Sequence, residues 1–469
     1  MSRHTHQACT SFLAGKMATL DGSTIIARNE DNFVAIWPKR AIVHPAGESP
    51  EQPFVSRGNQ FTTRLPQTTY QYTAVPDTDP SEGYYEESGI NEKNVAMSAT
   101  ESAYTNSRVL GVDPLVSNGI AEDAMLTVVL PYIDSAQAGI KRLGQLVSEQ
   151  GAAETNGVLF SDTEEVWYME IVSGHHWVAQ RIPDDAYAVV ANQLAIEDID
   201  FDRPQDFLTS ADIRQFVQRH RLNPDGGRFN SRHIFGTKTA DDAHYNTPRV
   251  WYGHRCFTPS AFEEPTSMEL PFIRQAEQKI SIPEVEAFLG SHYQETPYDP
   301  LGTGSETERH QFRAIGLSRT QNSHILQLRR NVAPTLAGVI WQCLGNPAFS
   351  PYVPFYAAGD QLAPSYAANN AAYDNQNPYW AGKLLDVLSE AHYHQNRKLL
   401  DNFLKETQIA GFQRLSTGDT QTTPTAAELG HFNQETATAA FAQIQVQIGK
   451  LIQANGDLSK LSFTMDADL

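Results

Sequence analysis

The stretch that decides the fold begins at Cys9, reads CTSFLAG over residues 9–15, and resumes as DGSTIIARNED over residues 21–31. Two apolar and β-branched runs flank an Asp-Gly pair, a pattern typical of a β-hairpin with a tight turn because both residues tolerate positive φ. The return strand of this hairpin would carry Arg28 and Asp31 back to the place where the first strand starts. One local element therefore brings together a thiol, a guanidinium and a carboxylate.

The eight residues before Cys9 read MSRHTHQA and are too short and too polar for a secretory signal. A thiol with an ordinary pKa of about 8.5 needs a base at neutral pH. A free α-amine, with a pKa of about 7.7–8, would lie within reach of the side chain on its own residue. We therefore expect residues 1–8 to be a short propeptide that is removed by cleavage between Ala8 and Cys9. The alternative is that Cys9 is a small buried hydrophobe, the usual role of a lone cysteine.

The composition is that of an ordinary globular protein, with 40% hydrophobic and 19% charged residues in a chain of 469. The net charge of −20 disfavours nucleic acid and anionic membrane surfaces as partners. No apolar run approaches the roughly 18–20 residues that a membrane helix needs. The chain has only Cys9, Cys256 and Cys343, which argues against a disulfide framework and favours a cytoplasmic location. No pair of cysteines has metal-ligand spacing, so we expect no metal and no other cofactor.

The rest of the chain shows a block of predicted strands followed by predicted helices. Apolar residues recur at helical spacing over residues 122–150, and Pro131 inside this segment predicts two helices or one kinked helix. Further strands are predicted at 71–75, 95–100, 157–160, 166–172, 176–180, 187–191, 324–328 and 337–343. The acidic, turn-rich segment 76–87 predicts a solvated loop, and two long amphipathic helices are predicted at 379–406 and 425–455. This order of elements indicates the α+β class.

The hairpin, with Cys9-Thr10 and the pattern Arg28-Asn29-x-Asp31, resembles the dipeptidase A and secernin family of N-terminal-nucleophile cysteine peptidases. Two later stretches support the resemblance, GINEK with SATES at 89–102 and WYME with GHHW at 167–177. These peptidases are relatives of the penicillin V acylases and bile salt hydrolases. The resemblance implies a four-layer αββα sandwich of two antiparallel sheets covered by helices. We assign residues 9–378 to this catalytic domain and residues 379–469 to a C-terminal helical extension packed on the same domain.

The resemblance also implies roles for the residues of the hairpin. Cys9 is the expected nucleophile. Arg28 would lower the pKa of the thiol, and Asp31 would hold the α-amine by a charge-assisted hydrogen bond. The alternative for Arg28 and Asp31 is a surface ion pair at the end of the hairpin.

Acyl transfer further needs hydrogen-bond donors aimed at the developing oxyanion. Asn192 follows the predicted strand 187–191 and matches the asparagine that supplies such a donor in the family. The acylases have a second asparagine where this chain has Glu101, so the backbone N–H of Glu101 is the expected second donor. The Glu101 carboxylate would pair with the ammonium group of a dipeptide, or else face a structural arginine or solvent. Arg249 matches a late active-site arginine of the family, and Arg255 is its rival.

The function implied by the resemblance is hydrolysis of dipeptides with broad specificity through an acyl-enzyme on Cys9. The expected partners are a small peptide substrate and further copies of the chain in a homo-oligomer, for which the C-terminal helices could provide the contact. One alternative is an amidase that acts on N-acyl compounds of the penicillin V or bile salt type. Another is a secernin-like protein with mainly an interaction role. The sequence contains neither His-Glu-x-x-His nor Gly-x-Ser-x-Gly, so it does not support a metallopeptidase or a serine hydrolase.

Overall fold

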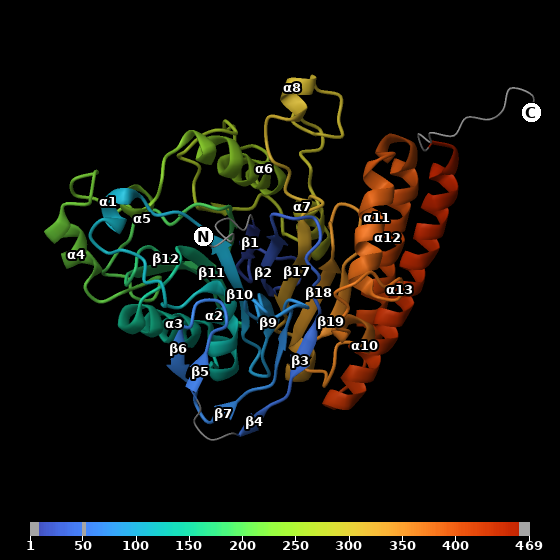
Figure 1. Ribbon diagram of the computed structural model, residues 1–469, viewed down its shortest axis with the longest axis horizontal. Helices are drawn as coiled ribbons and strands as arrows, with labels where there is room; N and C mark the ends of the chain where they lie inside the picture. Colours follow the sequence, from blue (N-terminus) through green and yellow to red (C-terminus); the bar gives the residue numbers. More distant parts are fainter. Residues whose placement is uncertain (1–8, 49–52, 459–469) are drawn as a thin grey trace, which may run out of the picture.

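Two antiparallel sheets form the centre of the structure, a computed structural model that describes residues 9–48 and 53–458 (Figure 1). The predicted propeptide, residues 1–8, lies outside the described residues. The strands of the seven-stranded sheet are, in spatial order, β16 (Ile273–Gln275), β14 (Ala186–Val190), β1 (Thr10–Ala14), β2 (Thr24–Asp31), β17 (Thr320–Leu328), β18 (Gly338–Leu344) and β19 (Val353–Tyr356). The strands of the six-stranded sheet are β15 (Phe207–Thr209), β13 (Trp177–Ile182), β12 (Val166–Ile171), β11 (Asn156–Ser161), β10 (Ala96–Ser102) and β9 (Ser88–Ile90).

Shorter elements connect and cover these sheets. Three two-stranded ribbons pair β3 (Ile42–His44) with β8 (Tyr72–Ala74), β4 (Gly47–Glu48) with β7 (Thr68–Thr69), and β5 (Pro53–Val55) with β6 (Thr62–Arg64). The helices before the C-terminal group are α1 (Ser107–Leu110), α2 (Glu122–Val129), α3 (Ala136–Gln150), α4 (Ile213–His220), α5 (Ser231–Phe235), α6 (Thr247–Phe257), α7 (Ile282–Leu289), α8 (Glu306–Arg309), α9 (Pro334–Ala337) and α10 (Pro364–Ala367). The C-terminal group is α11 (Pro378–Glu390), α12 (Tyr393–Gly418) and α13 (Ala426–Asn455). The α+β class predicted from the sequence is confirmed.

The predicted N-terminal hairpin is formed by β1 and β2, which pair antiparallel with Ser11 opposite Arg28. The prediction of a tight turn at Asp21-Gly22 is wrong, because a longer connection, residues 15–23, joins the two strands. Gly22 has the positive φ of a turn residue, at 77°. The connection is long because it pairs with other segments: Met17 N–H donates to the Asp184 carbonyl, and Leu20 N–H donates to the Ile280 carbonyl.

Three groups of buried apolar side chains show how the sheets and helices are layered. One group lies between the two sheets and includes Leu13 of β1 and Leu159 of β11. A second joins the other face of the seven-stranded sheet, with Phe12 of β1, to helices α6, α7 and α13. A third joins the other face of the six-stranded sheet to α2 and α3. Burial on both faces explains why these strands read as apolar runs.

The break between α2 and α3 follows the prediction made from Pro131, which lies in a 3₁₀ turn at Leu130–Tyr132. The single helix predicted over 379–406 is wrong, because α11 ends at Glu390 and α12 starts at Tyr393. No Gly or Pro marks this break. It lets both helices pack against α13, where Leu385 and Leu400 are buried in one apolar cluster.

The loop predicted over 76–87 is present, and residues 79, 81 and 82 are exposed, but several of its acidic residues are not solvated. Asp77 and Glu87 of this segment are buried. The Lys39 ammonium pairs with Asp77 at 2.7 Å, and the Arg28 guanidinium pairs with Glu87 at 2.5 Å. Acidic residues that have buried cationic partners can leave the solvent, which composition alone does not reveal.

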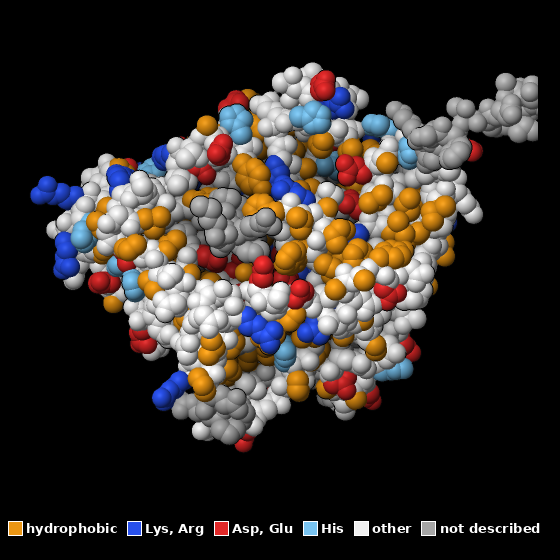
Figure 2. All heavy atoms as spheres, in the orientation of Figure 1, with side chains coloured by type: hydrophobic (Ala, Val, Ile, Leu, Met, Phe, Trp, Pro, Cys, Tyr) orange, Lys and Arg blue, Asp and Glu red, His pale blue; other side chains and the backbone are white. Residues whose placement is uncertain are grey.

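The C-terminal helices α11, α12 and α13 lie beside one another against β18 and β19 (Figure 1). The amide of Asn433 in α13 donates to the Tyr356 carbonyl and accepts from the Tyr356 N–H of β19, at 3.0 and 2.9 Å. Hydrophobic side chains gather over these helices on the face shown in Figure 2. The division at residue 378 stays a prediction. Within residues 9–48 and 53–458, no helix is long and apolar enough to cross a membrane.

Candidate active site

Cys9 lies directly before β1 and is completely buried. Since side chains alternate along a strand, Cys9, Ser11 and Leu13 share one face of β1. Leu13 packs between the two sheets, so this face points toward the six-stranded sheet. Arg28 lies opposite Ser11 on β2, and its Nη1 donates to Cys9 Sγ at 3.1 Å. The hairpin thus joins the expected nucleophile to a buried positive charge.

Four groups of the six-stranded sheet and of the segment before it hold the Arg28 side chain in place. Its Nε donates to Ser98 Oγ at 2.9 Å, and its Nη1 donates to the Thr100 carbonyl at 2.6 Å. Its Nη2 donates to the Ala99 carbonyl at 2.9 Å and to Glu87 Oε2 at 2.5 Å. Charge-assisted hydrogen bonds of this kind fix both position and charge. Arg28 is therefore a rigid cation directed at the thiol.

The pKa of the Cys9 thiol is raised well above its ordinary value. Burial is the main cause, Arg28 acts in the opposite direction, and the nearby Glu101 carboxylate raises the pKa further. Burial disfavours the thiolate because the charged form loses its solvation. The expected lowering by Arg28 is present but smaller than the effect of burial. At neutral pH the thiol form predominates, so attack by this sulfur requires a base.

Arg249, Asn192 and Glu101 continue the hydrogen-bonded chain from Cys9. Arg249 donates to the Cys9 carbonyl, to Thr10 Oγ1 at 2.9 Å, and to Asn192 Oδ1 at 2.8 Å. Asn192 Nδ2 in turn donates to Glu101 Oε1 at 3.0 Å and to the carbonyl of the residue after Glu101, also at 3.0 Å. The structure therefore brings together five of the six predicted site residues.

Burial of Arg249 distinguishes it from its rival. Arg249 is completely buried, whereas Arg255, on the same helix α6, is exposed. Burial and the charge of Arg313 lower the pKa of Arg249 to about 10, so the guanidinium remains charged at pH 7. Of the two arginines, Arg249 is the one that lies at the site.

Glu101 is a buried carboxylate, which removes the alternative that it faces solvent. Its Oε2 accepts a hydrogen bond from Ser11 Oγ at 2.5 Å. Burial raises the pKa of Glu101 to about 7, and Arg249 is the strongest influence in the opposite direction. Glu101 therefore changes charge close to neutral pH, beside the expected nucleophile.

Asp31 lies on the opposite side of β2 from Arg28, since the two residues are three apart in the strand. Its carboxylate accepts hydrogen bonds from Arg313 and, at 2.5 Å, from Thr320 Oγ1. Asp31 is still close enough to Cys9 for its charge to act on the thiol. The sequence of the hairpin did not predict Arg313, which comes from a loop 282 positions further along the chain.

Three polar groups near Arg28, namely Ser98, Glu87 and His324, were not among the predicted site residues. Ser98 Oγ contacts His324 Nε2 at 2.9 Å, in addition to accepting from Arg28. Burial and the charge of Arg28 hold the pKa of His324 well below its ordinary value, so the ring is neutral. Burial and Glu30 raise the pKa of Glu87, while Arg28 opposes them. Of these three residues, only Ser98 lies in a stretch that supported the family resemblance, SATES at 98–102. No local sequence pattern predicts a role for His324 or Glu87.

No group of three or more His, Cys, Asp or Glu residues that could hold a metal ion is found in the part of the chain that the structure describes. The acidic groups around Arg28 are engaged with cations and hydroxyl groups of the protein itself, as the Glu87 and Glu101 contacts show. The chemistry that this arrangement can support is nucleophilic attack by a thiol in a buried, cationic environment.

The chain matches known proteins over nearly its whole length. The family model described as Peptidase family C69 matches residues 8–406. A protein named probable dipeptidase from Latilactobacillus sakei is 47% identical over 98% of both chains. Probable dipeptidase B of Lactococcus lactis is 41% identical over 97% of both, and dipeptidase A of Lactobacillus helveticus is 40% identical over 84% of both. These matches confirm the resemblance seen in the hairpin, and this chain belongs to peptidase family C69.

Proposed function

We propose that this chain is a dipeptidase that uses Cys9 as its nucleophile and acts as an N-terminal-nucleophile hydrolase. The observation that carries the proposal is the contact of Arg28 Nη1 with Cys9 Sγ at 3.1 Å in a fully buried site. The names of the relatives, all of them dipeptidases, supply the substrate class. The layering of two facing sheets between helices supports assignment to the four-layer αββα sandwich.

The base in this proposal is the α-amine of Cys9 itself, released by cleavage after Ala8. The raised pKa of the thiol supports this step, because little thiolate forms without a proton acceptor. The amine is attached to the residue that carries the sulfur, so no other residue has to be positioned as the base. Asp31, whose charge acts on the Cys9 thiol, would accept a hydrogen bond from the amine and hold it.

In the proposed reaction, the amine takes the thiol proton while Cys9 Sγ forms a bond to the peptide carbonyl carbon. The oxyanion is held by Asn192 Nδ2 and by the backbone N–H of Glu101. The amine then gives the proton to the leaving nitrogen, the C–N bond breaks, and a thioester remains. Water, deprotonated by the same amine, hydrolyses the thioester. Because Asn192 Nδ2 donates to Glu101 in the free protein, binding of substrate must redirect one of its N–H bonds.

The preference for dipeptides is assigned to Glu101. Its carboxylate is buried beside the nucleophile and would pair with the ammonium group of a dipeptide. An N-acyl substrate has no charge at that place and would leave the carboxylate with only its neutral hydrogen-bond donors, Ser11 and Asn192, which disfavours the amidase alternative. Recognition of the ammonium and the peptide bond makes no demand on the side chains, which supports broad specificity. Burying so many charged groups around Cys9 is costly and favours catalysis over a purely interaction role.

The test is the N-terminal sequence and intact mass of the purified protein, combined with a dipeptide hydrolysis assay. Active protein is expected to start at Cys9, and Cys9→Ala is expected to keep residues 1–8 and to be inactive. Full activity in protein that retains Met1–Ala8 would overturn the mechanism. A homo-oligomer and a cytoplasmic location are also part of the proposal, and light scattering and cell fractionation test them.

A further inference from the structure

Asn246 is a buried amide beside the candidate active site and is not one of the reacting groups. It is the last residue of a π-helical turn, Asp242–Asn246, which lies directly before α6. The Thr247 N–H donates to the Asp242 carbonyl five residues before it, as expected for such a turn, and π-helical turns are frequent at functional sites. An asparagine at the start of a helix usually caps it by accepting a backbone N–H. The Asn246 side chain makes no cap hydrogen bond, so its polar atoms are used elsewhere.

Both ends of the Asn246 amide have partners. Its Oδ1 accepts a hydrogen bond from Arg249 Nη2 at 2.7 Å. Its Nδ2 donates to the main-chain carbonyl of Asn192 at 3.1 Å and to Asp242 Oδ1 at 2.9 Å. A guanidinium can only donate and a carboxylate can only accept, so these partners fix which end of the amide carries the nitrogen. Turning the amide over would place donor against donor and acceptor against acceptor.

The same contacts enclose Asn192, the expected oxyanion donor. Arg249 Nη2, which donates to Asn246, also donates to Asn192 Oδ1 at 2.8 Å. Asn246 therefore holds Asn192 directly at its main-chain carbonyl and through Arg249 at its side chain. Because Asn192 Oδ1 is bound to a group that can only donate, its Nδ2 is directed the other way, toward Glu101.

The position of Asn192 depends on contacts of this kind because the residue lies outside the sheet. Strand β14 ends at Val190, two residues before it. An oxyanion donor acts from about 2.7–3.1 Å, and a displacement of about 1 Å can cost about 10²-fold in rate. Arg249 is held independently of Asn246, since it also donates to the Tyr245 carbonyl and to Thr10 Oγ1, both at 2.9 Å. Loss of the Asn246 amide should therefore affect Asn192 more than Arg249.

We propose that Asn246 is a positioning residue for peptide hydrolysis, which holds the Asn192 amide in the orientation that receives the oxyanion. Asn246 acts through Asn192 and does not contact the substrate. The inference rests on the proposed function, since it requires that Asn192 Nδ2 stabilises the oxyanion.

The first test is steady-state hydrolysis of Leu-Gly by Asn246→Ala. We expect kcat to fall about 10- to 100-fold and KM to change less than about threefold, because the oxyanion forms only after the substrate has bound. Asn246→Ser is the second variant, for the case that Asn246→Ala does not fold. Its hydroxyl lies one bond length short of the amide nitrogen, so the same loss of kcat is expected. Normal kcat in the folded variant would overturn the proposal.

A double-mutant cycle with Asn192→Ala separates positioning from a general loss of structure. In the Asn192→Ala background, Asn246→Ala should lower kcat by less than about threefold more, because no amide remains to be positioned. A further loss as large as in the unmodified background would overturn the proposal. If Asn192→Ala is near normal by itself, the oxyanion assignment of the proposed function fails and the role of Asn246 fails with it. If Asn192→Ala is slow and Asn246→Ala is normal, only the role of Asn246 fails.

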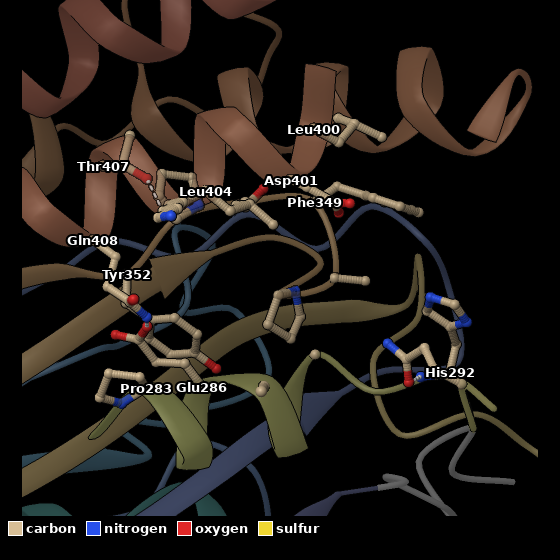
Figure 3. A pocket seen from close by; sticks show the side chains of 18 of the residues that line it. Pro283, Glu286, His292, Phe349, Tyr352, Leu400, Asp401, Leu404, Thr407 and Gln408 are labelled. Carbon is tan, nitrogen blue, oxygen red and sulfur yellow. Dashed lines mark hydrogen bonds between the residues drawn. The ribbon is translucent and has the colours of Figure 1, made fainter. Parts of the chain in front are cut away.

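Gln408→Ala is the matched control. Like Asn246, Gln408 donates from a side-chain amide to a carboxylate, Glu286 Oε2 at 2.5 Å. Both residues line a cavity of about 300 Å³ between α7, the loop 347–352 and α12 (Figure 3). Helix α7 packs on Phe12, on the opposite face of β1 from Ser11, so this amide lies away from the candidate active site. Gln408→Ala should leave kcat within about twofold. A loss of kcat as large as in Asn246→Ala would attribute both effects to destabilisation and overturn the proposal.

Discussion

Replacing Glu101 by glutamine tests the role of its negative charge, which the proposed function assigns to recognition of the substrate ammonium group. Glu101 is completely buried and accepts hydrogen bonds from Ser11 at 2.5 Å and Asn192 at 3.0 Å. Glutamine keeps the shape and one acceptor oxygen but removes the charge. We therefore expect Glu101→Gln to discriminate between a dipeptide, which carries an ammonium group, and its N-acetylated form, which does not.

The magnitude follows from the loss of one charge-assisted hydrogen bond in a buried site. Such a bond is worth about 1.5–3 kcal/mol, which corresponds to about 10- to 150-fold in kcat/KM. The loss applies to the dipeptide alone, so the ratio of kcat/KM for the two substrates falls by that factor. Since the chemical step is the same for both, an effect of the substitution on the thiol cancels in the ratio.

The pH dependence of this ratio gives a second, independent readout. The pKa of Glu101 is about 7, so its carboxylate is ionised above pH 7 and protonated below it. In the unmodified protein the preference for the dipeptide should therefore weaken as the pH falls from about 7 to 5.5, a range in which the substrate amine, with a pKa of about 7.7–8, stays protonated. In Glu101→Gln the ratio should be nearly independent of pH in that range, because glutamine does not titrate.

The assay is steady-state hydrolysis of Leu-Gly and N-acetyl-Leu-Gly followed by chromatography at several pH values. Glu92→Gln is the matched control, because Glu92 lies in the neighbouring GINEK stretch with its side chain 36% exposed and should leave the ratio unchanged. An unchanged ratio and an unchanged pH dependence in Glu101→Gln would refute the role of Glu101. The residue would then be a structural partner of the Arg249 and Asn192 chain.

Removing the Asn192 amide with Asn192→Ala is expected to lower kcat about 10²- to 10³-fold, and near-normal turnover would place the oxyanion donor elsewhere. Glu87→Gln leaves the buried Arg28 without its carboxylate, a loss of about 3–5 kcal/mol that should lower the melting temperature; an unchanged value would contradict this. Chelators should leave activity intact, whereas iodoacetamide should abolish it by alkylating Cys9, measured in a Cys256→Ser background because Cys256 is exposed. Activity lost to a chelator and restored by zinc would contradict the thiol mechanism.

The sequence alone determined the features that depend on neighbours along the chain. The hairpin was predictable because the alternation of apolar residues fixes which side chains share a face and which strands can pair locally. That pairing is what brings Arg28 opposite Ser11 and into contact with Cys9. The break before α3 was predictable because Pro131 cannot donate the helical hydrogen bond. The family was recognisable from the same hairpin.

Other features were decided only by tertiary contacts. Arg249 and Arg255 have the same charge and lie on the same helix, and only the burial of Arg249 identifies it as the arginine at the site. Asp31 forms an ion pair with Arg313, and Glu87 forms one with Arg28. These partners are too far apart in the sequence for a local pattern to predict the pairing. A charged residue needs a partner of suitable charge or polarity. Whether that partner is water, a buried cation or a ligand depends on the tertiary structure. This is because the cost of burying a charge depends on everything packed around it.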